Sequence, residues 1–149
     1  MIGAPAGPPF AVESTLDELA DLYGLDPAEF RRRNLPHGGA ASAALDAVLR
    51  EARWERRATL GPWRGLGLAA GEDWAHVVEV DGAAGAFTLV IAWNAGVVPA
   101  DPAAFAPVAE AALANALAHA TGRRLRELPL TAEQLRARLA EPAVVEPFT

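Results

Sequence analysis

The residue types that most often perform chemistry are few in this chain, and their spacing does not group them. None of His37, His76 and His119 has a second metal ligand at the spacing of a known motif, so no metal site is expected. Ser14 has no histidine near it in a recognised nucleophile pattern and suits the N-cap of a helix. The pair Gly65 and Gly67 lacks a third glycine and a following helix, which argues against a dinucleotide site. Spacing alone therefore predicts no catalytic, metal or dinucleotide site.

Four tryptophans, at positions 54, 63, 74 and 93, provide large flat apolar surfaces. Such residues usually anchor a hydrophobic core or its rim. Trp74 and Trp93 stand beside the ends of predicted strands, where they could also line a pocket for a flat apolar ligand. The sequence leaves both interpretations open.

The composition excludes several classes of protein. With 149 residues, 52% hydrophobic and 21% charged, the chain is long and apolar enough for one globular domain. The net charge is −6 and all 13 basic residues are arginines without a basic stripe, so nucleic acid is not an expected partner. The absence of cysteine excludes thiolate sites and disulfides. No secretory signal or membrane-spanning run is visible, so we expect a cytoplasmic protein without membrane contact.

The N-terminal part is expected to lead from a loop into a helix. Residues 3–9 are rich in Gly and Pro, which suit a loop, and residues 10–12 could pair briefly as a strand. Ser14 is a good N-cap, and Asp17 three residues later gives a start that is similar to a capping box. We therefore predict that the first helix begins at Ser14.

A second helix is expected directly after the first. Gly24 ends the first helix, because glycine readily adopts the left-handed conformation of a C-cap. Asp26 as N-cap and Pro27 at the first helical position then start the second helix. The run Arg31–Arg33 is interpreted as its solvated, C-terminal face.

Three strands and a hairpin are predicted in the middle of the chain. The strands are expected over residues 63–70, 75–81 and 86–93. Residues 82–85 are too short for a parallel crossover, so the second and third strands should pair antiparallel. Gly65 and Gly67 indicate a close approach of another backbone to the first strand. The side chains expected to face the helices are those of Val78, Val80, Leu89 and Ile91.

Further helices are expected on either side of these strands. Ser42 can cap a helix that continues to about Trp54. Because Pro107 would break a helix already under way, the main C-terminal helix is expected from Pro107 to Thr121, with Gly122 as C-cap. Thr131 and Gln134 form a capping box for a last helix.

These elements predict an α+β fold. A small, mostly antiparallel sheet would be packed by helices on one face. One domain would comprise residues 1–141, and residues 142–149 would form a loose tail.

Several of these segments resemble the molybdenum-binding large subunit of the aldehyde oxidase/xanthine dehydrogenase family, in particular the isoquinoline oxidoreductase beta-subunit type. The resemblance covers most of residues 3–130. The segments that carry it are Gly3–Pro5, Glu13–Ser14, Asp17–Ala20, Gly24–Arg31, Asn34–Leu35, Trp63–Ala69, His76–Asp81, Asn94–Pro99, Ala114–Leu117 and Ala120–Thr131.

The chain also departs from the family pattern. The family's arginine before the Gly-x-Pro segment would fall ahead of Met1, and its glutamine is Ala6 here. The resemblance implies a cofactor contact at Gly3 and Ala4. In the family, a long stretch containing a Gly-Glu-Pro motif with the catalytic base lies where this chain has only residues 98–107. Asp101 beside Pro102 is the one candidate to replace that base. The alternative interpretation of Asp101 is a turn residue at the entry of a helix.

The resemblance implies a shortened relative that is inactive alone and acts as one component of a multi-chain oxidoreductase, with another oxidoreductase subunit as a partner. The family's hydroxylation of aldehydes or N-heterocycles on a molybdopterin cytosine dinucleotide would then occur only within the larger complex, and this chain alone would bind no cofactor. Two alternatives remain: a non-catalytic binding or assembly module that kept the scaffold, and a small protein that binds an apolar ligand.

Overall fold

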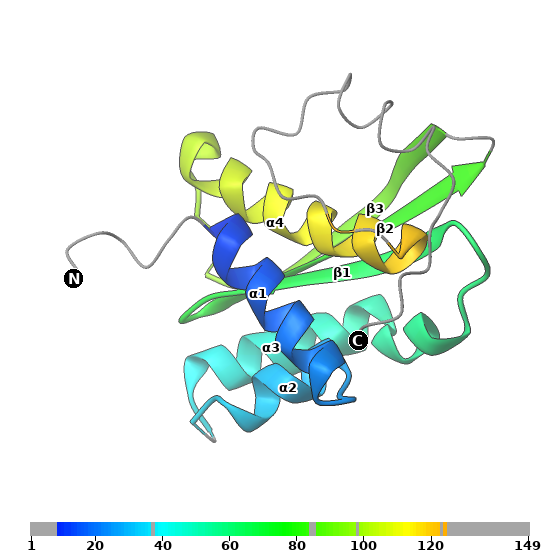
Figure 1. Ribbon diagram of the computed structural model, residues 1–149. Coiled ribbons are helices and arrows are strands. Elements are labelled where there is room, and N and C mark those ends of the chain that lie inside the picture. Colours follow the sequence, from blue (N-terminus) through cyan, green and yellow to red (C-terminus); the bar gives the residue numbers. More distant parts are fainter. Residues whose placement is uncertain (1–8, 37, 84–85, 98, 123, 125–149) are drawn as a thin grey trace.

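The computed structural model describes residues 9–36, 38–83, 86–97, 99–122 and 124, and Figure 1 shows its ribbon. The elements follow one another as α1 (Pro9–Leu22), α2 (Pro27–Arg33), α3 (Ala40–Ala52), the 3₁₀ helix η1 (Trp54–Thr59), β1 (Arg64–Ala70), β2 (Trp74–Ala83), β3 (Ala86–Gly96) and α4 (Pro102–Thr121). The predicted α+β class is confirmed. The helix expected to start at Thr131 and the tail 142–149 lie outside the described residues.

The sheet has the predicted antiparallel topology. Its strands lie in the order β1-β2-β3, with Gly67 opposite Val78 and Val78 opposite Ala92. The β2–β3 pairing runs down to Ala83 opposite Ala86, so the expected hairpin is confirmed and is longer than predicted. The register shifts once, because Glu79 pairs with Ile91 and Val80 with Leu89, which leaves Val90 as a bulged residue.

Helices cover both faces of the sheet, which corrects the expectation of one covered face. On one face, α3 packs through Leu45 and Val48 against Leu66 and Val77. On the other face, α4 packs against Val78, Val80 and their neighbours. Figure 1 shows α3 and α4 on opposite sides of the strands. Successive strand residues point to opposite faces, and β1 and β2 are apolar or small on both, so both faces need a cover.

The contact between β1 and α4 depends on glycine. A Cβ atom at Gly67 would overlap the Ala112 carbonyl oxygen and the Ala116 amide nitrogen, and one at Gly65 would overlap the Ala116 carbonyl oxygen. The predicted close approach of another backbone is therefore confirmed. The helix lies directly on the strand because no side chain separates them.

The first helix begins earlier than predicted. Helix α1 starts at Pro9 and includes the residues expected to form a strand, because proline fits the first turn of a helix. Ser14 lies inside the helix with a buried Oγ atom that has no hydrogen-bond partner among the described residues, so it is not an N-cap. Asp17 is buried as well and pairs with Arg31 instead of a helix terminus.

The break between the first two helices is confirmed. Gly24 has a φ of 68°, and Asp26 accepts hydrogen bonds from the amides of Ala28 (2.8 Å) and Glu29 (3.3 Å). Asp26 also accepts a bond from Trp54 Nε1 at 2.9 Å. The same aspartate therefore starts α2 and connects it to the first residue of η1.

Two other helix starts were predicted too late. Helix α3 begins after Gly39, which makes no side-chain cap, and not at Ser42. Helix α4 begins at Pro102, with Asp101 as its N-cap, and contains Pro107 in its interior. The Asp-Pro pair supplies a cap and a pre-set first residue. The larger cost of Pro107 inside the helix is offset by the packing of α4 on the sheet, where Val108, Ala111 and Ala112 are buried.

The predicted face of β3 is wrong at Ile91. Its side chain is 43% exposed, and that of the neighbouring Val90 is 51% exposed. Val78 and Val80 are buried against α4 as expected, and the side chain of Leu89 lies outside the described part. The helices reach β3 only near Trp93 and Ala95, so the middle of this strand has no helical cover among the described residues.

Candidate functional site

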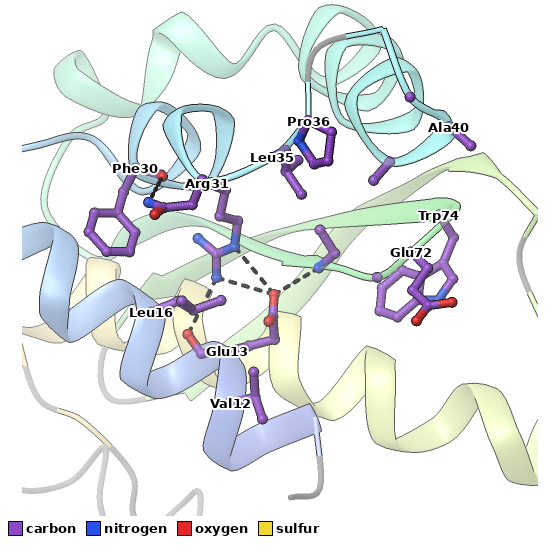
Figure 2. A pocket seen from close by; sticks show the side chains of 15 residues that line it. Val12, Glu13, Leu16, Phe30, Arg31, Leu35, Pro36, Ala40, Glu72 and Trp74 are labelled. Atoms are coloured by element: carbon purple, nitrogen blue, oxygen red, sulfur yellow. Dashed lines mark hydrogen bonds and ion pairs between the residues drawn. The ribbon is translucent and has the colours of Figure 1, made fainter. Parts of the chain in front are cut away.

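An apolar cleft of about 770 Å³ lies between α1, α2, the start of α3 and the turn from β1 to β2 (Figure 2). We call it the α1–α3 cleft. Its lining residues are Val12, Glu13, Leu16, Phe30, Arg31, Asn34, Leu35, Pro36, Gly39, Ala40, Ala41, Ala70, Gly71, Glu72 and Trp74. Most of them are apolar, and the volume is in the range of small-molecule sites, about 300–1,000 Å³.

A buried ion-pair cluster lies at the wall of this cleft. The Arg31 Nη2 atom lies 3.2 Å from Glu13 Oε1, and Nη1 lies 2.9 Å from Asp17 Oδ1. All three side chains are at most 5% exposed. The prediction that the run from Arg31 to Arg33 is solvated is therefore wrong for Arg31 and holds for its two exposed neighbours. Arg31 occupies the buried face of α2 because α1 presents two carboxylates there.

The two carboxylate oxygens of Glu13 differ in their surroundings. Oε1 accepts hydrogen bonds from the Ala70 amide (2.8 Å) and from Arg31 Nε (3.3 Å). Oε2 makes no hydrogen bond or ion pair with any residue in the described part of the chain. Burial raises the pKa of Glu13 above its ordinary value, against the opposing effects of Arg31 and the Ala70 amide. The wall of the cleft thus contains a fixed carboxyl group with one free acceptor oxygen.

The cluster continues into the centre of the molecule. Arg31 Nη2 and Asn115 Nδ2 both donate to the Leu68 carbonyl, at 3.4 and 2.9 Å, and Asn115 Nδ2 lies 3.3 Å from the Glu13 carbonyl oxygen. Arg124 Nη1 donates to Asn115 Oδ1 at 2.6 Å. These bonds connect α1, α2, β1 and α4, so the polar groups beside the cleft are held by four elements.

Asp101, the one catalytic candidate, does not line this cleft. Its exposed carboxylate accepts the Ala103 amide at 3.0 Å and caps α4, which is the helix-entry role. The proposed cofactor contacts Gly3 and Ala4 lie outside the described residues, as does His37.

The two described histidines are structural. His76 is buried, its Nδ1 atom pairs with Asn94 Oδ1, and its ring meets Phe105 edge to face. Burial lowers the pKa of His76. His119 Nδ1 accepts the Leu66 amide at 3.1 Å, and burial, aided by the nearby Arg57 charge, lowers the pKa of His119 to about 4. Both rings therefore stay neutral at pH 7 and hold strands in place.

The two tryptophans proposed as pocket walls lie in different places. Trp74 lines the α1–α3 cleft and contacts the α4 core at its edge. Trp93 packs at the α3 side of the sheet, where the Arg56 guanidinium lies 5.9 Å from its ring centroid. The structure therefore places only Trp74 in the cleft.

The cleft does not suit the cofactor implied by the resemblance. A molybdopterin cytosine dinucleotide carries anionic phosphates, whereas Glu13 and Glu72 add carboxylates to the lining. Among the described lining residues, Arg31 is the one basic residue, and Glu13 and Asp17 already neutralise it. The described residues also contain no group of three or more His, Asp or Glu that could hold a metal ion. No chemical step is therefore assigned to that cofactor on this chain.

Sequence reasoning missed the cluster of Glu13, Asp17 and Arg31. A signal was present, because Glu13, Asp17 and Ala20 recur at helical spacing and share the buried face of α1. Two acids on the buried face of a helix require a basic partner, and α2 supplies three arginines. Which of these arginines turns inward depends on the angle between the helices, which the sequence does not show.

Comparison of the chain with protein-family models, with curated proteins and with solved structures gives no match. Within the described residues, no helix combines the length and apolar character needed to cross a membrane.

Proposed function

We propose that this chain is a non-catalytic component of a multi-chain oxidoreductase, and that a strand of another chain in that complex pairs with β3. The observation that carries the proposal is the free edge of β3. In the described sheet, β2 occupies one side of this strand and no strand occupies the other.

The chemistry of β3 suits strand addition. Its sequence, AFTLVIAWNAG, contains no charged residue and no proline. Exposed sheet edges in monomers are usually protected by charges, prolines, β-bulges or a covering helix, and of these the described part of β3 shows only the bulge at Val90. Here Val90 and Ile91 are about half exposed, and Val97 just beyond the strand is 68% exposed. A partner strand would receive the free backbone groups and cover these side chains.

The position of this edge agrees with the resemblance to the molybdenum hydroxylase large subunit. In that family, the long stretch that this chain lacks follows directly after the segment corresponding to Asn94–Pro99, which is the end of β3. A second polypeptide that supplies a comparable stretch would therefore meet the chain at β3.

The residues that carry the resemblance also favour a scaffold role. Glu13, Asp17, Arg31 and Asn115 join in the buried network, and Gly67 provides the contact between β1 and α4. These groups hold the fold together. A relative that lost the catalytic residues but kept the fold would retain residues of this kind.

The test is co-purification of the tagged chain from its native host, with identification of bound proteins by mass spectrometry. We expect an oxidoreductase polypeptide to accompany the wild-type chain. The variant Ile91→Lys should lose it, because a charge on the free edge opposes strand addition. Leu22→Lys, which places the same charge on an exposed apolar residue at the end of α1, should retain it.

Two results would contradict the proposal. One is an oxidoreductase partner that binds Ile91→Lys as tightly as the wild-type chain, which would place the interface elsewhere. The other is capture of nothing but a second copy of this chain, which would make β3 a homodimer edge.

A further inference from the structure

We propose that the α1–α3 cleft binds a flat, mainly apolar small molecule that carries one N–H or O–H group, and that Glu13 Oε2 accepts the hydrogen bond from this group. The inference is independent of the partner proposed for β3, because the cleft and β3 share no lining residue.

The walls of the cleft determine the apolar character of the ligand. Leu16, Phe30, Leu35 and Trp74 contribute large hydrophobic surfaces, and Ala40 and Ala41 leave open space at the start of α3. Aromatic rings prefer offset-stacked or edge-to-face contacts with other rings, so Phe30 and Trp74 favour a flat ligand. Burial of such a ligand is driven by the apolar area that it removes from water.

Glu13 determines the polar requirement. Its side chain is 4% exposed, yet Oε2 has no partner among the described residues. Oε2 is not among the fully buried side-chain atoms that lack a hydrogen-bond partner, so it can be reached from the cleft that Glu13 lines, and a donor on the ligand can bind there. Figure 2 shows the Glu13 carboxylate at the cleft with Arg31 bonded to it and Trp74 further along the wall.

The carboxylate is also held in position before any ligand arrives. The Ala70 amide and Arg31 fix Oε1, and Arg31 is itself fixed by the carbonyl of Pro27 at 3.1 Å. A side chain held in this way loses little freedom on binding, which favours both affinity and selectivity. The carboxylates of Glu13 and Glu72 in the lining disfavour an anionic ligand.

A matched pair of probes separates the apolar contribution from the hydrogen bond. Indole and benzofuran have nearly the same shape, but indole has an N–H donor where benzofuran has an oxygen acceptor. Titration of the ¹⁵N-labelled full chain should shift the amides of Ala70 and Gly71 and the indole N–H of Trp74. We expect indole to bind at least about tenfold more tightly than benzofuran, since a hydrogen bond to a charged group is strong.

Two variants test the assignment of the acceptor and of the site. Glu13→Gln can replace Oε2 by an amide donor, so the preference for indole should disappear. Ala41→Leu fills the cleft without touching the ion pairs, so it should weaken both probes at least about tenfold. Ala43→Leu is the matched control on the exposed face of α3 outside the cleft, and it should bind both probes as the wild-type chain does.

The proposal is overturned if neither probe shifts the cleft residues, or if Ala41→Leu and Ala43→Leu bind alike. It is also overturned if indole and benzofuran bind equally to the wild-type chain, because Glu13 would then not select the ligand. If Glu13→Gln unfolds, as its spectrum would show, the wild-type probe pair and the two alanine variants still decide the outcome.

Discussion

Arg31 is the residue on which the packing of the two N-terminal helices depends. Its guanidinium contacts two carboxylates of α1 and donates to the carbonyl oxygens of Pro27, Glu13 and Leu68. A buried ion pair gives little net stability compared with an apolar pair of the same shape. Removal of one partner is different, because the other charge is left buried and unpaired.

We therefore predict that Arg31→Ala lowers the free energy of unfolding by about 3–5 kcal/mol, since Glu13 and Asp17 lose their counter-ion. Arg33→Ala is the control, because it removes an exposed pair with Glu29 on the same helix and should cost no more than about 1 kcal/mol. Urea unfolding followed by circular dichroism measures both. Equal losses for the two variants would show that the buried cluster contributes nothing beyond a surface pair.

At this scale the sequence shows residue types but not burial. Ser14 fits an N-cap by type and position, yet an earlier proline starts the helix and Ser14 turns into the core. Arg31 cannot be distinguished from Arg32 and Arg33 by type, and only the packing of α2 on α1 separates them. Glu13, the central residue of the candidate site, is marked in the sequence by its helical spacing with Asp17 and by the resemblance, but neither signal shows that its side chain lines a cleft.

At the scale of elements, the contact of β1 with α4 makes the most specific demand on the sequence. The strand residue Gly67 lies against the backbone of Ala112 and Ala116, and no side chain can be accommodated there. The contact requires that glycine remain at this position, because backbone atoms of a helix cannot move aside as a flexible side chain can.

We predict that Gly67→Ala destabilises the protein by about 3 kcal/mol or more, because the added methyl group forces α4 away from the sheet. Gly61→Ala is the matched control. Gly61 is exposed, and a Cβ there meets no atom within 4 Å, so the change should stay within about 0.5 kcal/mol. Thermal unfolding of both variants tests this, and a wild-type midpoint for Gly67→Ala would mean that the helix is not seated as described.

The bounds of helices and strands were predicted well where the residue types at their ends determine them. Asp26 with Pro27, Gly24 and Gly122 act as the caps that their types indicate. The same Asp-Pro signal starts α4 at Asp101, and the helix continues through Pro107 because it packs on the sheet, which the sequence does not show. The hairpin was predictable because its turn is short.

At the scale of the whole molecule, the three-stranded antiparallel sheet followed from the strand patterns, but its two helical layers did not. Glycine and alanine alternate with leucine along β1, so that strand indicated one apolar face. The second face is covered because α4 packs by backbone contact on the glycines of β1 and through side chains on Val78 and Val80 of β2. The contact with the glycines leaves no hydrophobic pattern in β1.

The last prediction concerns chemistry. The purified chain, expressed in a host that makes molybdopterin, should contain no stoichiometric molybdenum and should not reduce dye with aldehydes or N-heterocycles. The physical reason lies at Asp101, the one acid placed to replace the family's base. Its exposed carboxylate accepts a hydrogen bond from the Ala103 amide and so caps α4. Asp101 does not line the α1–α3 cleft. A positioned acid–base group typically contributes about 10²–10⁴-fold in rate, which an exposed cap does not supply.

Two substitutions separate the capping role of Asp101 from a catalytic one. Asp101→Ala should lower the free energy of unfolding by about 1 kcal/mol, because the Ala103 amide loses its acceptor. Asp101→Asn should be nearly as stable as the wild-type chain, since asparagine caps helices as well as aspartate does. Asparagine cannot act as a base. Stoichiometric molybdenum together with turnover that both substitutions abolish would therefore make the chain a minimal enzyme and Asp101 its base.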